Sequence, residues 1–125
     1  MKVSKDNFER FKKEFIKWQK LLGLTQYRID FFHEKLKNSY AEIYGDEMTK
    51  AIRVSLTTEL DKDSSKVDGG PEKHARHEVL HLLIHRMKWL GQTRYIENLD
   101  LDEEGEAIVV RLENAIKELT NAANK

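Results

Sequence analysis

The chain has 125 residues, no cysteine, and 22 basic against 22 acidic side chains, so that its formal net charge is zero. This length fits one domain spanning residues 1–125. The balanced charge lacks the basic surplus of a nucleic-acid binder, and the lack of cysteine excludes disulfides and thiolate metal sites. Any metal must therefore be held by histidine and carboxylate groups.

The N-terminal residues and the hydropathy of the chain predict a cytoplasmic location. Residues 1–6 lack the apolar core and the small-residue cleavage site of a secretory signal. No run approaches the ~18 apolar residues that span a bilayer. We therefore expect neither a membrane nor a nucleic acid as partner.

The first half of the chain predicts one helix followed by three strands. Apolar residues recur every three or four positions over 6–22, as on one face of an amphipathic helix that ends at Gly23. Short β-like runs follow at 27–34, 40–44 and 51–56, separated by polar breaks. Three successive strands predict a small antiparallel meander.

The segment 57–70 has no periodicity and few large apolar residues, which is typical of a loop. It directly precedes the most informative part of the chain, and the sequence leaves open whether it is a lid or a simple connection.

The second half predicts two helices. Pro71 suits a helix start and Gly91 a helix end, which gives a helix of about 20 residues and roughly 30 Å. Its apolar residues cover most of its circumference, so we expect it to be packed inside the domain. A last helix is predicted from Asp100 or Asp102 to about Asn121. Its expected inward residues are Ile108, Val109, Leu112, Ala115, Ile116 and Leu119.

The buried helix contains an HExxH motif, His77-Glu78-Val79-Leu80-His81. Residues four apart share a helix face, so His77 and His81 can bind one zinc ion at about 2.0 to 2.1 Å each. Glu78 lies about 100° around the helix, where it can take a proton from water activated by Zn²⁺ and pass it to the departing amine. This motif predicts peptide hydrolysis without a covalent intermediate. The plainer interpretation is two half-buried helix histidines beside a solvated glutamate.

A catalytic zinc ion usually takes three protein ligands, and the neighbouring sequence excludes one arrangement. Ile84 and Met87 occupy the glycine and third-histidine positions of the metzincin pattern HExxHxxGxxH. His85 lies about 12 Å along the axis from His77, too far to share one ion, and we expect it to pack or to be solvated. His33 carries no motif.

The HExxH helix and the acidic helix after it are the basis of a resemblance to a known group. In these features the chain resembles the zincin superfamily, specifically the minimal gluzincin-like metallopeptidases often encoded by phages and prophages. The resemblance covers most of the chain: an N-terminal helix, a three-stranded sheet, the HExxH helix and a C-terminal helix. It implies an α+β zincin-like fold, and a host-cytoplasmic location if the protein is phage-encoded.

In that family a glutamate of the final helix completes the zinc site. The resemblance points to Glu106 as the third ligand, with Glu103 as second choice. An ordinary exposed glutamate near a helix N-terminus is the alternative. Larger gluzincins often have an aspartate where this chain has Val110, so the group that orients the histidines stays open between a backbone carbonyl, Glu113 and Asn114.

Peptide hydrolysis also needs a donor for the developing oxyanion, and Tyr95, His74 and Arg94 are the candidates, with Tyr95 first. In zincins the strand before the active-site helix commonly binds substrate by edge pairing, which here indicates 51–56.

The leading hypothesis is a zinc-dependent peptide-bond hydrolase acting on a protein or peptide substrate. A second hypothesis is a non-catalytic zinc-binding protein of a phage or mobile element that binds a protein partner. A third is a helical regulator without metal. The substrate and the oligomeric state remain open.

Overall fold

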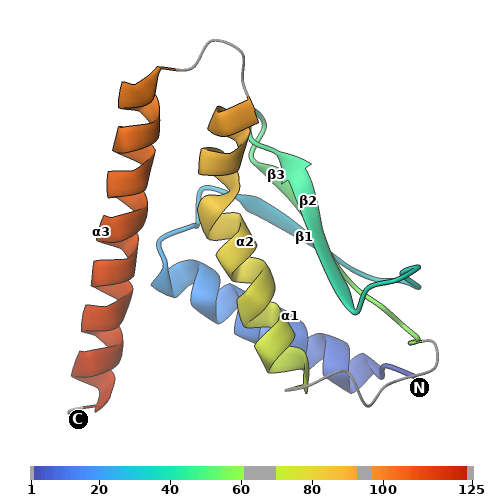
Figure 1. Cartoon of the computed structure of the whole chain (residues 1–125). Helices are drawn as coiled ribbons and strands as arrows, with labels where there is room; N and C mark the ends of the chain where they lie inside the picture. The colour runs from blue at the N-terminus through green and yellow to red at the C-terminus, as the bar shows by residue number, and fades with distance from the viewer. Residues whose placement is uncertain (1, 61–69, 93–96, 124–125) are drawn as a thin grey trace.

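The computed structural model describes residues 2–60, 70–92 and 97–123 and forms a small α+β domain (Figure 1). The predicted α+β class is confirmed, and the described part contains three helices and one three-stranded sheet. In chain order the elements are α1 (Lys5–Leu21), β1 (Arg28–His33), β2 (Ala41–Asp46), β3 (Ala51–Leu56), α2 (Gly70–Gln92) and α3 (Asn98–Ala123).

Helix α1 begins at a serine cap and ends at the glycine that the sequence predicts. The Ser4 side chain accepts a hydrogen bond from the backbone N–H of Asn7 at 3.1 Å and so caps the first turn. At the other end Gly23 adopts a φ of 68°, in the left-handed region that glycine enters without strain.

The sheet is mixed, and the predicted antiparallel meander is wrong. The strand order is β1-β3-β2, in which β3 pairs in parallel with β1 and antiparallel with β2. The strand at 51–56 is thus the central one, and its two edges are both occupied.

The connection from β1 to β2 explains this order. It crosses the end of β3 and is held on both sides: the N–H of Glu34 donates to Leu56 O at 3.1 Å, and the N–H of Thr57 donates to Tyr40 O at 2.8 Å. This connection leaves a gap of two strand spacings, about 10 Å, which β3 fills. Hydrophobic alternation sets the face of a strand but not its neighbour, so the sequence pattern did not reveal the crossing.

Strand β2 runs through Gly45 and Asp46, where the sequence indicated a break. A Cβ atom on Gly45 would lie 2.4 Å from Ala51 O, so glycine serves here to let β2 approach β3 closely. The turn begins after Asp46, and Lys50 closes it with a φ of 61°.

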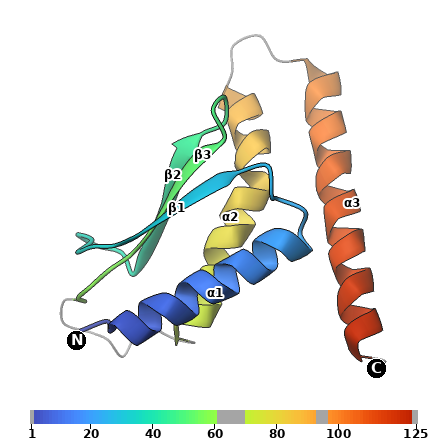
Figure 2. The same cartoon turned by 180° about the vertical axis from the view of Figure 1, so that it is seen from behind.

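The domain has two main layers with a third helix outside them. Helices α1 and α2 cover one face of the sheet, and α3 lies on the side of α2 away from the sheet (Figures 1 and 2). The inner face of β3 and the facing sides of α1 and α2 form the core. Its largest fully buried apolar side chains are Phe11, Phe15, Leu24, Ile52, Leu56, Leu82, Val54 and Val79.

Helix α2 is fixed to α1 at its N-terminal end. The Arg10 guanidinium donates to both carboxylate oxygens of Glu72, at 2.7 and 2.9 Å. The helix is less enclosed than its composition predicts, because Leu80 and Ile84 are 51% and 43% exposed. One side of α2 therefore stays open to solvent, and it is the side next to the histidines.

Helix α3 packs along a narrow line, and most of its predicted inward residues are exposed. Ala115 is buried and Ile108 contacts the core, whereas Val109, Leu112, Ile116 and Leu119 are exposed. The close contact involves a small residue, since a Cβ on Gly105 would lie 3.7 Å from the Met87 side chain. An apolar periodicity thus predicted the helix correctly but not the face that is covered.

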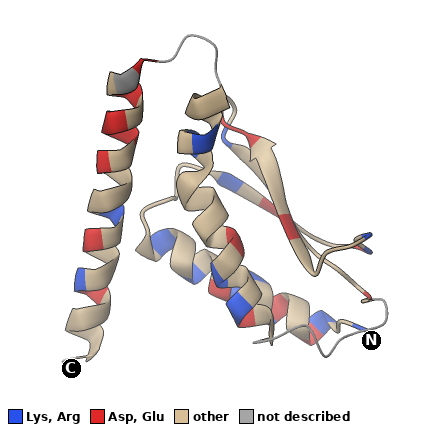
Figure 3. Cartoon of the chain, in the orientation of Figure 1, with Lys and Arg blue, Asp and Glu red and all other residues tan. Residues whose placement is uncertain are grey.

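Charges of both signs are spread over the helices and the sheet, with acidic residues gathered at the start of α3 (Figure 3). Negative charge there is favourable because it faces the positive end of the helix dipole. Within the described ranges no helix is long and apolar enough to cross a membrane. The predicted loop at 57–70 lies largely outside the described residues.

Candidate functional site

The HExxH residues line an open hollow between α2 and β2. The hollow has a volume of about 620 Å³. One wall is helical and the other is the strand. Its lining residues are His77, Glu78, His81, Ile84, His85 and Lys88 from α2, and Ala41, Glu42 and Ile43 from β2.

His77 and His81 lie one helical turn apart with their imidazoles together. Their Nε2 atoms are 3.1 Å apart and their rings meet edge to face, with centroids 4.7 Å apart. Burial lowers the pKa of His81, and the charges of His77 and Lys88 lower it further. His81 is therefore neutral at neutral pH, which is the form that binds a metal ion.

Glu78 is buried in the same hollow, with 7% of its surface exposed. Burial raises the pKa of Glu78 to about 7, and the negative charge of Glu42 adds to the rise. Among the described residues no group donates a hydrogen bond to the Glu78 carboxylate, and none forms an ion pair with it. This carboxyl group thus gains and loses its proton near neutral pH in the metal-free protein.

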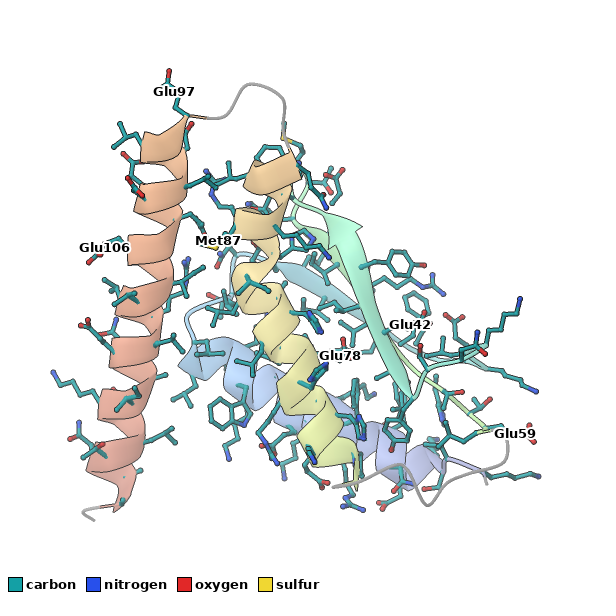
Figure 4. All side chains as sticks on the ribbon, viewed as in Figure 1. Glu42, Glu59, Glu78, Met87, Glu97 and Glu106 are labelled. Carbon is teal, nitrogen blue, oxygen red and sulfur yellow. The ribbon has the colours of Figure 1, made fainter. Side chains whose placement is uncertain are left out.

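Glu42 lies on the strand wall, opposite the helix. Figure 4 shows Glu78 on the side of α2 that faces β2, where Glu42 is carried. Two carboxyl groups therefore share the hollow with the two imidazoles.

A second hollow continues the first along the same two elements. It has a volume of about 270 Å³ and shares Ile43, His85 and Lys88 with the first hollow. Together they form an elongated depression, here called the β2–α2 groove, with His77 near one end and His85 between its two parts.

Glu106, the predicted third ligand, does not lie in this groove. It is exposed and points away from α2 on the far side of α3 (Figure 4). With Glu103 and Asn114 it lines a separate hollow of about 600 Å³. Helix α3 turns Gly105 toward Met87 of α2 and Ile108 toward the core, which leaves Glu106 outside the groove. The ligand role of Glu106 and of Glu103 stays a prediction.

The other candidates are placed as follows. No three His, Asp or Glu side chains within the described ranges are grouped closely enough to hold a metal ion. The His74 ring packs against Tyr40 at a tilt of 45°, with centroids 4.4 Å apart, and His33 stacks on Phe8 at 4.8 Å; neither lines the groove. Arg94 and Tyr95 lie outside the described residues.

Sequence reasoning did not identify Glu42 or Lys88, and it expected His85 only to pack or to be solvated. His85 and Lys88 follow His81 at four and seven positions, so helical periodicity alone could have placed them on the same face. Glu42 could not be found in this way, because its position depends on the strand order.

Comparison with known proteins yields no relative: no family model matches the chain, and no curated protein or solved structure matches it significantly.

Proposed function

We propose that the chain is a zinc-dependent peptide-bond hydrolase, of the zincin-like type that the HExxH motif indicates. The observation that carries the proposal is the pair of imidazole nitrogens of His77 and His81, 3.1 Å apart beside a buried glutamate. Two nitrogens on one tetrahedral zinc ion, each at about 2.05 Å, are about 3.3 Å apart. The observed separation is close to this value, which supports the proposal that the two histidines share one zinc ion.

Zinc bound by His77 and His81 would supply a Lewis acid that lowers the pKa of a water molecule and polarises a carbonyl group. The chain supplies the proton acceptor. Glu78 is enclosed in the same hollow and lies one residue after His77, so it can hold the proton of the attacking water and transfer it to the leaving amine.

The groove suits an extended peptide. Strand β2 pairs only with β3 in the described sheet, so its other edge is open, and residues 41–45 of β2 line the groove. An extended chain can pair with such an edge through backbone hydrogen bonds. This role was predicted for 51–56, but β3 is central and offers no free edge. The substrate-binding strand in this proposal is therefore β2.

The third protein ligand has three candidates. Glu106, and Glu103 as second choice, have the family resemblance in their favour, but they line a separate hollow beside Gly23, outside the groove. Glu42 has its position in its favour, since it is the carboxylate that faces the HExxH residues across the hollow. Its side chain would have to move toward the histidines, because the described side chains do not form a group of three ligands.

Metal analysis tests this proposal. We expect one zinc per chain after dialysis against zinc, and loss of it in His77→Ala. Glu42→Gln and Glu106→Gln discriminate the third ligand. The variant that removes it should bind zinc at least about 10-fold more weakly, because even groups that only orient the ligands contribute this much. Native protein that binds no zinc under zinc-replete conditions would overturn the proposal.

Hydrolysis separates catalysis from binding. Glu78→Gln should keep zinc and lose at least about 100-fold of the cleavage rate on a mixture of denatured proteins. Full cleavage by a zinc-loaded Glu78→Gln protein would contradict the role of Glu78.

A non-catalytic zinc protein that binds a partner is the second candidate. It is favoured by the exposed apolar residues Val109, Leu112 and Ile116 of α3, which a partner could cover. Zinc at one equivalent without cleavage of the protein mixture, together with a stable partner in a pulldown, would favour it over hydrolysis.

A further inference from the structure

A second buried glutamate lies close to the groove and takes no part in the chemistry above. Glu47 is in the turn after β2, and its side chain is 1% exposed. Its carboxylate accepts hydrogen bonds from Tyr27 Oη at 2.8 Å, from His85 Nδ1 at 2.8 Å and from Lys50 Nζ. Arg86 adds a positive charge, with its Nη1 3.9 Å from the carboxylate.

These partners decide the charge of Glu47. Burial alone would raise its pKa, but hydrogen bonds from Lys50, His85 and Tyr27 outweigh burial and lower the pKa below the ordinary value. Glu47 is therefore ionised at neutral pH. An ionised carboxylate only accepts hydrogen bonds, so the Nδ1 atom of His85 must carry a proton.

The ring of His85 is held in place by this bond. The Tyr27 ring packs edge-on against it, with centroids 6.0 Å apart and planes at 80°. With Nδ1 engaged by Glu47, Nε2 is the nitrogen left to act. His85 lines both hollows of the β2–α2 groove, one helical turn beyond His81.

The spacing argues against His85 as a ligand of the zinc ion held by His77 and His81. Eight residues separate His85 from His77, about 12 Å along the helix axis. A substrate bound along β2 can span this distance, whereas one ion cannot. An imidazole held in place next to the two proposed zinc ligands is suited to form a hydrogen bond to the substrate.

We propose that His85, positioned by Glu47, contacts the substrate in the groove and forms a hydrogen bond to it through Nε2. This inference rests on the proposed hydrolase function and names a residue that orients its substrate. Glu47 is the positioning residue and His85 the one that touches substrate.

Acetohydroxamate, a small zinc-binding oxyanion, is the probe for this role. Calorimetry on the zinc-loaded protein should show about tenfold weaker binding of acetohydroxamate to His85→Phe than to native protein, because a hydrogen bond is lost. Zinc content should be unchanged. His33→Phe is the matched control, since it replaces a half-buried histidine that stacks on Phe8 outside the groove, and it should bind the probe like native protein.

The tautomer of His85 gives a readout that needs neither zinc nor activity. Long-range nitrogen–proton NMR of the zinc-free protein should show a proton on Nδ1 of His85 and lose this preference in Glu47→Gln. If Glu47→Gln does not fold, Tyr27→Phe removes one hydrogen bond to the same carboxylate and should weaken the preference in the same direction.

The outcomes separate the two proposals. Native protein without zinc overturns the hydrolase and this inference together. Zinc-loaded His85→Phe that binds acetohydroxamate as tightly as native protein overturns the role of His85 and leaves the hydrolase intact. Loss of zinc in His85→Phe also overturns it, because His85 is then a metal ligand.

Discussion

Two glutamates are buried along the same side of α2, and their surroundings are opposite. Glu47 receives three hydrogen bonds and its pKa is lowered, whereas Glu78 receives none from the described residues and its pKa is raised to about 7. Burial is similar in the two cases, with relative exposures of 3% and 7%. The supply of donors, and not burial itself, therefore decides which carboxyl group stays ionised.

The difference separates a stabilising residue from the residue that we propose as the catalytic base. The hydrogen bonds of Glu47 join the α1–β1 connection, the β2–β3 turn and α2, so they stabilise the fold. Glu78 is a desolvated carboxyl group that reduces stability when ionised, which is common where a group is kept for chemistry. Substitutions at the two positions should consequently act in opposite directions.

Replacing Glu47 should have the largest effect. Glu47→Gln leaves Lys50 without its buried anion, and we expect the free energy of unfolding at pH 7 to fall by about 3 kcal/mol. The pKa of Glu47 is lowered by folding, so its contribution is full above the ordinary value of 4.5 and is lost as the pH falls through the folded value. The difference in the free energy of unfolding between native protein and Glu47→Gln, measured by urea unfolding, should therefore become smaller below about pH 4.5.

Glu34→Gln is the matched control for that measurement. Glu34 also binds a cation, with Arg53 Nη2 2.7 Å from its carboxylate, but the pair is on the surface. Water replaces the lost bond there, so the loss of stability should be much smaller. Equal losses in the two variants would remove the distinction between a buried and an exposed pair.

Replacing Glu78 should stabilise the zinc-free protein. Glu78 has a raised pKa, so its contribution to stability is full below 4.5 and is lost as the pH rises through about 7. Glutamine carries no charge at any pH, and we expect Glu78→Gln to raise the free energy of unfolding by up to about 3 kcal/mol at pH 8 and to have little effect at pH 4. Urea unfolding in the presence of a chelator measures both values. A variant less stable than native at pH 8 would mean that the ionised carboxylate has a partner.

The sequence was informative wherever the signal was local. The strand 51–56 was predicted with its observed bounds, and α1 and α2 were predicted to within one residue at either end. Local signals such as the glycine at position 23 and the proline at 71 fix element ends through backbone geometry. The HExxH motif likewise placed His77 and His81 on one helix face, because four residues make about one turn.

Long-range geometry accounts for what the sequence did not predict. The β1-β3-β2 order depends on a connection that crosses β3, and the groove wall at Glu42 follows from that order. The pairing of Glu47 with His85 joins residues 38 positions apart, which no periodicity reveals. For α3 the apolar residues occupy more of the helix than one contact face, so pattern alone could not tell which side faces α2.

Replacing Glu42 should have the smallest effect on stability. This variant tests what raises the pKa of Glu78, and so sharpens its contrast with Glu47. The charge of Glu42 is the second cause of the raised pKa of Glu78, after burial. Glu42→Gln should therefore lower the pKa of Glu78 in the zinc-free protein, and stability at pH 8 should rise by only a few tenths of a kcal/mol. Carbon NMR of the Glu78 carboxyl group during a pH titration measures the shift directly. Asp30→Asn on β1, which lies outside the groove, is the control and should leave the titration unchanged. An unchanged pKa in Glu42→Gln would show that burial alone sets the proton affinity of Glu78, and that the strand wall bears on the site through its shape and not through its charge.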